Sequence, residues 1–142
     1  YDEADEKFYI PENVYIIGTM NDIDRSVDSF DFAMRRRFRF IEITPNDREN
    51  MLDSLSPETK KDALNRMNAL NKVIAETEGL NENYQIGPSY FLHLKNIDVD
   101  DLWTDYLQPL LHDYIRGMYN ESSLMDSFKV AYFGNDDESA EN

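Results

Sequence analysis

Four arginines stand close together, at positions 35, 36, 37 and 39, in a chain of 142 residues whose formal net charge is -15. A guanidinium group stays charged and grips two phosphate oxygens at once, so arginines at the exit of a helix can reach a phosphate-bearing ligand held by a neighbouring subunit. The helix dipole lets one cation stabilise a helix C-terminus, but three cations in a row add little further stability. The alternative is a solvated cationic face that pairs with the chain's many carboxylates.

A second polar group follows the apolar run "NVYIIGTM", residues 13–20. Asn21, Asp22 and Asp24 would lie at the carboxyl end of a buried strand, which is where open α/β sheets hold their ligands. An amide and a carboxylate there can orient a water molecule or the metal shell of a phosphate. Asn21 and Asp24 are equally suited to a turn and a helix cap, so both interpretations stay open.

The elements that would position these side chains form a strand, helix, strand unit. Residues 13–20 are short, apolar and rich in β-branched side chains, which predicts a strand buried on both faces. A helix is expected from about Asp24 or Ser26 to Arg36, because apolar residues recur at three and four positions. Residues 38–43, "FRFIEI", predict a second strand that stops before Pro45. A unit of this length is typical of a crossover in an α/β sheet.

After Pro45 the pattern predicts helices only. We expect a short helix at about 47–55, a long one at about 57–78, another over 102–115 that Pro109 must kink or restart, and a last one near 123–132. The fold class is therefore an α/β remnant, with two parallel-type strands and one crossover helix, followed by an all-α helical part. The predicted helical core consists of Leu64, Met67, Leu70, Ile74, Trp103, Leu107 and Leu111.

Composition narrows the function classes. The chain has no cysteine and two histidines, which excludes disulfides and thiolate chemistry and argues against a histidine-rich metal site. An excess of 29 acidic over 14 basic residues argues against broad binding to nucleic acid or to an anionic membrane. No apolar run reaches the roughly 18 residues of a membrane span. We expect an intracellular protein with solvated acidic ends at 1–12 and 133–142.

Together these features resemble a known family. Residues 20–38, "MNDIDRSVDSFDFAMRRRF", are similar to the second half of the AAA+ module of the McrB family, the nucleotide-driven motor subunits of modification-dependent restriction systems. In that family a strand ends in Met-Asn-Thr-Ala-Asp-Arg-Ser, followed by a helix with Asp-Tyr-Ala-Leu and then Arg-Arg-Arg-Phe. The matching positions are Met20, Asn21, Asp24, Arg25, Ser26, Asp31, Ala33, Arg35, Arg36, Arg37 and Phe38. Asp22-Ile23 replaces the usual Thr-Ala.

The resemblance implies roles for the polar residues of this stretch. Asn21 would be the sensor-1 residue that polarises the attacking water, and Asp24 would support the same loop. Arg36 and Arg37 are the candidates for an arginine finger that acts on the adjacent subunit's nucleotide. Asp31 would help to position that pair across the subunit interface, where Arg35 would also lie.

The helical half resembles the lid of AAA+ proteins and would span residues 46–132, after the C-terminal part of the α/β subdomain at 13–45. Within it "QIGPSYFLHL", residues 85–94, resembles the sensor-2 region, although no arginine follows the glycine as it does in many such lids. The resemblance implies that Ser89 and Tyr90 touch the nucleotide or the lid hinge. His93 is expected to be packed or hydrogen-bonded, not catalytic.

Two parts of an AAA+ module are missing from the sequence. There is no Gly-x-x-x-x-Gly-Lys-Ser/Thr loop to cradle phosphates and no apolar strand ending in Asp-Glu to hold Mg²⁺. We therefore expect a fragment that neither binds a nucleotide tightly nor hydrolyses it alone.

The parent protein implied by the resemblance is a cytoplasmic bacterial or archaeal NTPase. It would use GTP with Mg²⁺, assemble into a hexameric homo-oligomeric ring, and drive an McrC-like nuclease on DNA bound by a separate domain. An ATP-using relative and a non-catalytic AAA+ scaffold stay open. A nucleic-acid-binding module that uses "RRRFRF" is a third class, against which the net charge and the predicted burial of Phe38 and Phe40 both count.

Overall fold

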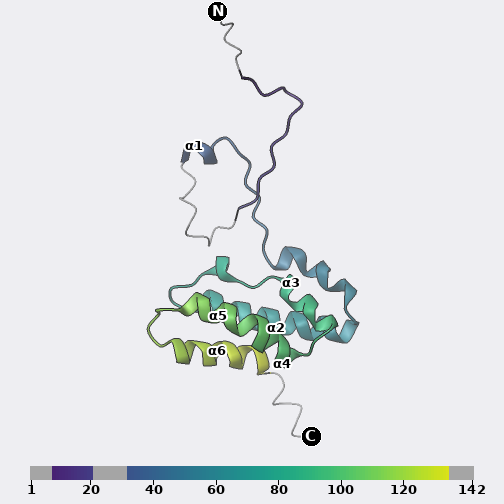
Figure 1. Ribbon diagram of the computed structural model, residues 1–142, viewed down its shortest axis with the longest axis vertical. Helices are drawn as coiled ribbons and strands as arrows, with labels where there is room; N and C mark the ends of the chain where they lie inside the picture. The colour runs from purple at the N-terminus through teal and green to yellow at the C-terminus, as the bar shows by residue number, and fades with distance from the viewer. Residues whose placement is uncertain (1–7, 21–31, 135–142) are drawn as a thin grey trace, which may run out of the picture.

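The computed structural model describes residues 8–20 and 32–134, and all structural statements below refer to these residues. Helices from residue 46 onward pack into one body, and residues 8–20 and 32–43 extend away from it (Figure 1). The elements in chain order are α1 Phe32–Arg35, the 3-10 helix η1 Asn46–Ser54, α2 Pro57–Glu76, the 3-10 turn η2 Glu82–Tyr84, α3 Pro88–Phe91, the 3-10 turn η3 Leu92–Lys95, α4 Val99–Leu102, the π-helical turn η4 Trp103–Leu107, α5 Gln108–Ile115 and α6 Glu121–Phe133.

Helix α2 is the central element of the body, and local sequence explains both of its ends. The Ser56 hydroxyl accepts a hydrogen bond from the Thr59 amide at 3.2 Å, and Pro57 occupies the first turn, where its missing N–H costs nothing. Beyond the helix, Gly79 has a φ of 91°, a left-handed conformation that glycine adopts without strain. The predicted helix at 57–78 is thus confirmed to within two residues.

One face of α2 is buried in the core that all later helices share. The buried apolar residues of this core are Leu52, Leu55, Ala63, Met67, Leu70, Ile74, Leu80, Ile86, Phe91, Leu102, Trp103, Leu107, Leu111, Ile115, Phe128 and Tyr132. Six of the seven predicted core residues are among them. Leu64 is the exception: it lies at the edge of the buried face and is half-buried against the cluster.

A buried arginine joins α2 to α6. Arg66 is only 4% exposed; its Nε donates to Asp62 at 2.8 Å, and a terminal nitrogen donates to the Tyr132 carbonyl, also at 2.8 Å. The guanidinium carbon lies 5.3 Å from the centre of the Tyr132 ring, and the Tyr132 hydroxyl donates to the Val99 carbonyl at 3.0 Å. This arrangement ties three helices together and satisfies a charge that would be costly to bury unpaired.

Pro109 was expected to kink or restart the helix, but the helical backbone runs without a break from Val99 to Ile115. The chain takes a π-helical turn at η4, in which the Gln108 amide donates to the Trp103 carbonyl five residues back. Pro109 then falls in the first turn of α5, where no helical N–H is required. The predicted helix over 102–115 therefore lies within one continuous helical segment made up of α4, η4 and α5.

The two predicted strands do not form among the described residues. Residues 14–20 and 39–43 have no regular secondary structure, and of the predicted helix at 24–36 the described part is α1. The physical reason is that a strand needs hydrogen-bonding neighbours, and the described residues supply none. The α/β remnant is therefore not confirmed, whereas the helical part is.

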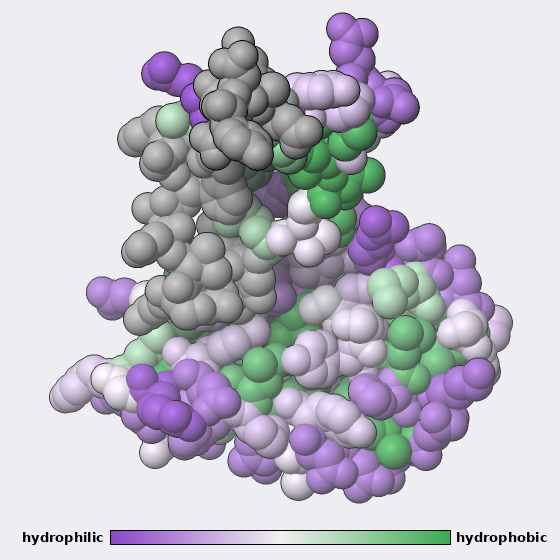
Figure 2. Space-filling view, turned by 45° about the horizontal axis from the view of Figure 1, so that its top comes forward, coloured by the Kyte–Doolittle hydropathy of each residue, from purple (hydrophilic) through white to green (hydrophobic). Residues whose placement is uncertain are grey.

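The same segments leave large apolar side chains uncovered. Tyr15 is 87% exposed and Ile17 is 93% exposed, and Phe38, Phe40, Ile41 and Ile43 are exposed as well. We call residues 8–20 and 32–43 the arm. Apolar side chains gather on this arm, above the helical body (Figure 2). No helix among the described residues has the length and apolar character that crossing a bilayer requires.

Truncating Leu107 to alanine should lower the free energy of unfolding by roughly 2 to 5 kcal/mol, because the side chain is fully buried in the shared core. Denaturant titration followed by circular dichroism measures the change. Val130→Ala is the control, since Val130 is exposed on α6 and its truncation should change little. Equal effects of the two substitutions would show that the π-helical turn is not packed into the core.

Candidate functional site

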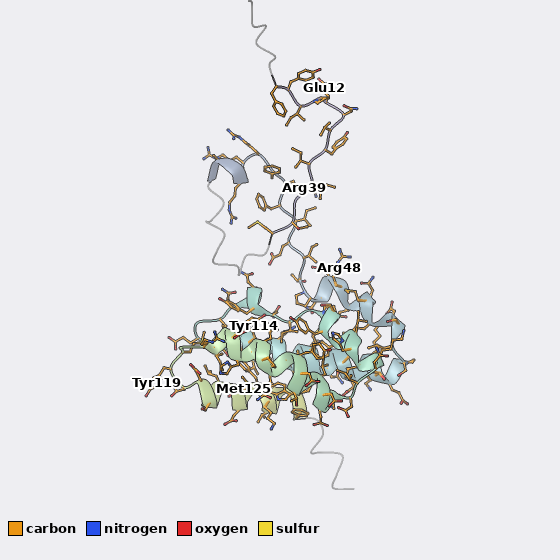
Figure 3. The ribbon with its side chains drawn as sticks, viewed as in Figure 1. Glu12, Arg39, Arg48, Tyr114, Tyr119 and Met125 are labelled. Carbon is orange, nitrogen blue, oxygen red and sulfur yellow. The ribbon has the colours of Figure 1, made fainter. Side chains whose placement is uncertain are left out.

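The arginine segment follows directly from α1. Arg35 ends the helix, the chain turns at Arg36 and Arg37, and Arg39 follows on irregular backbone. Figure 3 labels Arg39 on this arm. All four side chains are exposed. The Arg35 guanidinium lies 5.6 Å from the centre of the Phe40 ring, within the range of a cation–π contact.

Arg36 and Arg37 make no ion pair with any other described residue. The ion pairs of the described chain are Lys60–Asp53, Arg66–Asp62 and Arg116–Asp113, all of them in the helical body. The alternative of a cationic face paired with the chain's own carboxylates therefore finds no support in residues 8–20 and 32–134. Within the described part of the chain both guanidinium groups are exposed and without an ion pair.

The remaining residues predicted for this site cannot be placed beside the arginines. Asn21, Asp24 and Asp31 lie outside the described residues, so their roles stay predictions. Among the described residues, no group of three or more histidine or acidic side chains could hold a metal ion.

The second predicted site lies on the helical body, where the chain enters α3. Ser89 is exposed and Tyr90 is half-buried against the core. Ile86 lies just before the turn Gly87–Tyr90 and is held by Asn71 of α2. The Asn71 side-chain amide donates to the Ile86 carbonyl at 2.9 Å and accepts from the Ile86 amide at 2.7 Å. Sequence analysis missed Asn71, because its partner Ile86 is 15 residues away in the chain and no local pattern links the two.

Three tyrosines surround this turn. The rings of Tyr84 and Tyr114 meet edge to face with centres 5.1 Å apart, and Tyr90 is close enough to influence Tyr114. Burial, with smaller contributions from Tyr90 and Tyr84, raises the pKa of Tyr114 to about 12. Figure 3 marks Tyr114 on α5. The cluster gives the entrance to α3 an aromatic flank.

His93 is exposed and stacks on Tyr106, with ring centres 4.1 Å apart and an interplanar angle of 23°. The expected packing contact is therefore present, although the side chain is exposed, and the non-catalytic role stays a prediction. A separate open groove is lined by Glu58, Asp62 and Asp98 together with apolar residues, but two of these carboxylates already have structural partners: Asp62 binds Arg66, and Asp98 caps α4 through the Asp101 amide.

The junction between the arm and the helical body is capped by Asp47. Its carboxylate accepts hydrogen bonds from the Thr44 amide at 2.8 Å and from the Thr44 hydroxyl at 2.7 Å. These bonds, the backbone one first, hold the pKa of Asp47 below its ordinary value. The stabilising contribution of these hydrogen bonds is therefore complete at neutral pH, and it is lost as the pH falls through the lowered pKa of Asp47.

Alkaline pH should destabilise the body through Tyr114. A pKa raised from 10 to about 12 means that the stabilising contribution of this group is complete below pH 10 and is lost as the pH rises toward 12. Tyr114→Phe should therefore retain more of its neutral-pH melting temperature between pH 10 and 12 than the wild type does. Tyr119→Phe, at an exposed position, is the control. Identical wild-type and Tyr114→Phe curves would contradict the assignment.

Comparison with known proteins finds a likeness over much of the helical body. Residues 62–123 match the family model described as "McrB, alpha-helical lid domain", a range that begins within α2 and ends in the first turn of α6. The EcoKMcrB subunit of a type IV methyl-directed restriction enzyme from Escherichia coli (strain K12) is 46% identical over 99 residues. The alignment covers 64% of this chain and 22% of that protein. No solved structure gives a significant match. The chain is therefore similar to McrB, and residues 62–123 of its helical body match the lid domain of that family.

Proposed function

We propose that the chain is part of an McrB-like AAA+ NTPase subunit, in which the arginine segment completes the active site of the adjacent subunit. The observation that carries the proposal is the pair Arg36 and Arg37: both are exposed, and neither has an ion-pair partner among the described residues. They lie on an arm that precedes the residues matching the McrB lid model, which supports the proposal.

The uncovered apolar segments support a larger α/β unit. Residues 13–20 and 38–43 expose side chains of strand-forming type, and this costs free energy unless another surface covers them. In the proposal they pair with further parallel strands of the same subunit, with a crossover helix between them. The sheet would fix the direction in which α1 and the arginines point.

The proposed chemistry divides between the two sites. Asn21 would polarise the attacking water with support from Asp24, and Arg36 or Arg37 would neutralise the charge that develops on the transferred phosphoryl group of the neighbour's nucleotide. Asp31 and Arg35 would belong to the same subunit interface.

On the lid, Ser89 and Tyr90 would contact the nucleotide. The nucleotide would be GTP or ATP with Mg²⁺, held by a phosphate loop and an Asp-Glu strand that this sequence does not contain. We expect no tight nucleotide binding by the 142 residues alone.

The proposed assembly is a homo-oligomeric ring, hexameric by resemblance, that acts in the cytoplasm with an McrC-like nuclease. DNA would be recognised by a separate domain. This part of the proposal rests on the likeness to the McrB subunit of the E. coli enzyme.

A second candidate, nucleic-acid binding by the arginine segment, is favoured by one observation. Phe38 and Phe40 were expected to be buried, yet both are exposed beside Arg35 and Arg39. Exposed aromatic and cationic side chains can stack on bases and contact phosphates. DNA binding by this chain with a steep salt dependence that is lost in Arg35→Ala and Arg39→Ala would favour this candidate.

Mixed rings test the shared active site. One full-length subunit carries an inactivated phosphate loop, and the other carries Arg36→Ala and Arg37→Ala; GTP and ATP turnover are recorded separately and in mixtures. Each variant alone should be slower than wild type by about 10³-fold or more, as for other trans-acting arginines. The mixture should recover turnover, because some interfaces combine an intact pocket with intact arginines.

Lys60→Ala is the matched control for loss of a cation, since Lys60 pairs with Asp53 on the surface of the helical body. It should leave turnover unchanged. Wild-type turnover in the variant with both Arg36→Ala and Arg37→Ala would contradict the arginine-finger role. The arginines would then be an ordinary charged surface.

A further inference from the structure

Asn71 makes an unusual pair of hydrogen bonds for a helix residue. It is 5% exposed, and its amide both donates to and accepts from the backbone of a single residue, Ile86. A side-chain amide supplies one acceptor and donors in one plane, so it can satisfy both backbone groups of a buried residue at once. Alanine or leucine at this position would leave the Ile86 amide and carbonyl buried without partners.

The segment held in this way is the turn that enters α3. Ile86 and Pro88 are buried on either side of Gly87, and Phe91 is fully buried at the end of α3. Ser89 is exposed between these anchors, and Tyr90 is half-buried. The backbone from Ile86 to Phe91 is thus fixed to the core by three buried side chains. The hydrogen bonds of Asn71 add a polar attachment at Ile86.

Gly87 has no structural reason to be glycine. Its φ of -81° and ψ of 161° are extended values that any residue adopts, and they suit a residue before proline. A Cβ added at this position would meet only the Ser89 hydroxyl oxygen, at an ordinary 3.9 Å. The bare backbone therefore leaves open space beside Ser89, which is a common use of glycine where a ligand comes close to the main chain.

We propose that Asn71 is a positioning residue for nucleotide binding. Through Ile86 it holds the Gly87–Tyr90 turn where Ser89 and Tyr90 contact a nucleoside triphosphate, and Gly87 gives that ligand room. The inference rests on the proposed function, in which the nucleotide binds at this turn. It adds that a side chain of α2 holds the turn in its binding conformation.

The test uses Asn71→Ala, Gly87→Ala and the control Thr77→Val in the full-length protein. Thr77 is also a buried polar residue at the end of α2, but its hydroxyl bonds only to the Val73 carbonyl within the same region of the helix. Steady-state kinetics with GTP and ATP give KM and kcat, nucleotide binding is measured directly, and amide hydrogen exchange is followed over 86–90.

Asn71→Ala should raise KM by about tenfold or more with a smaller change in kcat, because the contacts that it disturbs are made on binding. It should also speed exchange of the Ile86 amide. Thr77→Val should do neither. Gly87→Ala should raise KM without lowering the melting temperature, since alanine fits this backbone conformation without strain. This variant keeps the test decisive if Asn71→Ala folds poorly.

Outcomes separate this inference from the function on which it rests. If the wild type neither binds nor hydrolyses GTP or ATP, both are overturned. If the wild type is active and mixed rings recover turnover, but Asn71→Ala and Gly87→Ala keep wild-type KM values, the proposed function stands and the inference is overturned. Equal changes in Asn71→Ala and Thr77→Val would also overturn it, because the effect would then be general destabilisation of α2.

Discussion

The helical body depends on how α2 buries one face that is not wholly apolar. Met67, Leu70 and Ile74 supply the hydrophobic part, and burial of such side chains is the main source of stability. Arg66 and Asn71 share that face, and each is satisfied by backbone groups of another segment. Apolar packing alone would allow neighbouring segments to slide, whereas these polar contacts fix α6 and the turn before α3 at defined positions on α2.

The arm differs from the body, because the large apolar side chains described on it are exposed. Ile17 and Ile41 are largely exposed, although the sequence around each is typical of buried strands. The body therefore has its own core, and the arm has the composition of an element that needs a larger sheet. In the proposed function this difference has a purpose, because a sheet built from both strands would place Arg36 and Arg37 on a rigid support at the subunit interface.

Local signals predicted the helical body well. The long helix followed from apolar residues at helical spacing, and most of the predicted core is buried. The π-helical turn before Pro109 was not predictable, because several backbone arrangements can absorb a missing N–H. Arg66 and Asn71 were missed because their partners, Tyr132 and Ile86, are distant in sequence. Strand pairing is non-local in the same way, so a pattern can indicate a strand while the described chain offers it no neighbour.

The most direct test of this account is amide hydrogen exchange over residues 13–20 and 38–43, measured in the 142-residue chain and in the full-length protein. The account predicts fast exchange in the 142-residue chain and strong protection in the full-length protein, because unpaired amides exchange freely and sheet amides do not. Amides of α2 should be protected in both and serve as the internal reference. Fast exchange of both segments in the full-length protein would contradict the central claim that they are strands of an α/β unit supporting the arginines.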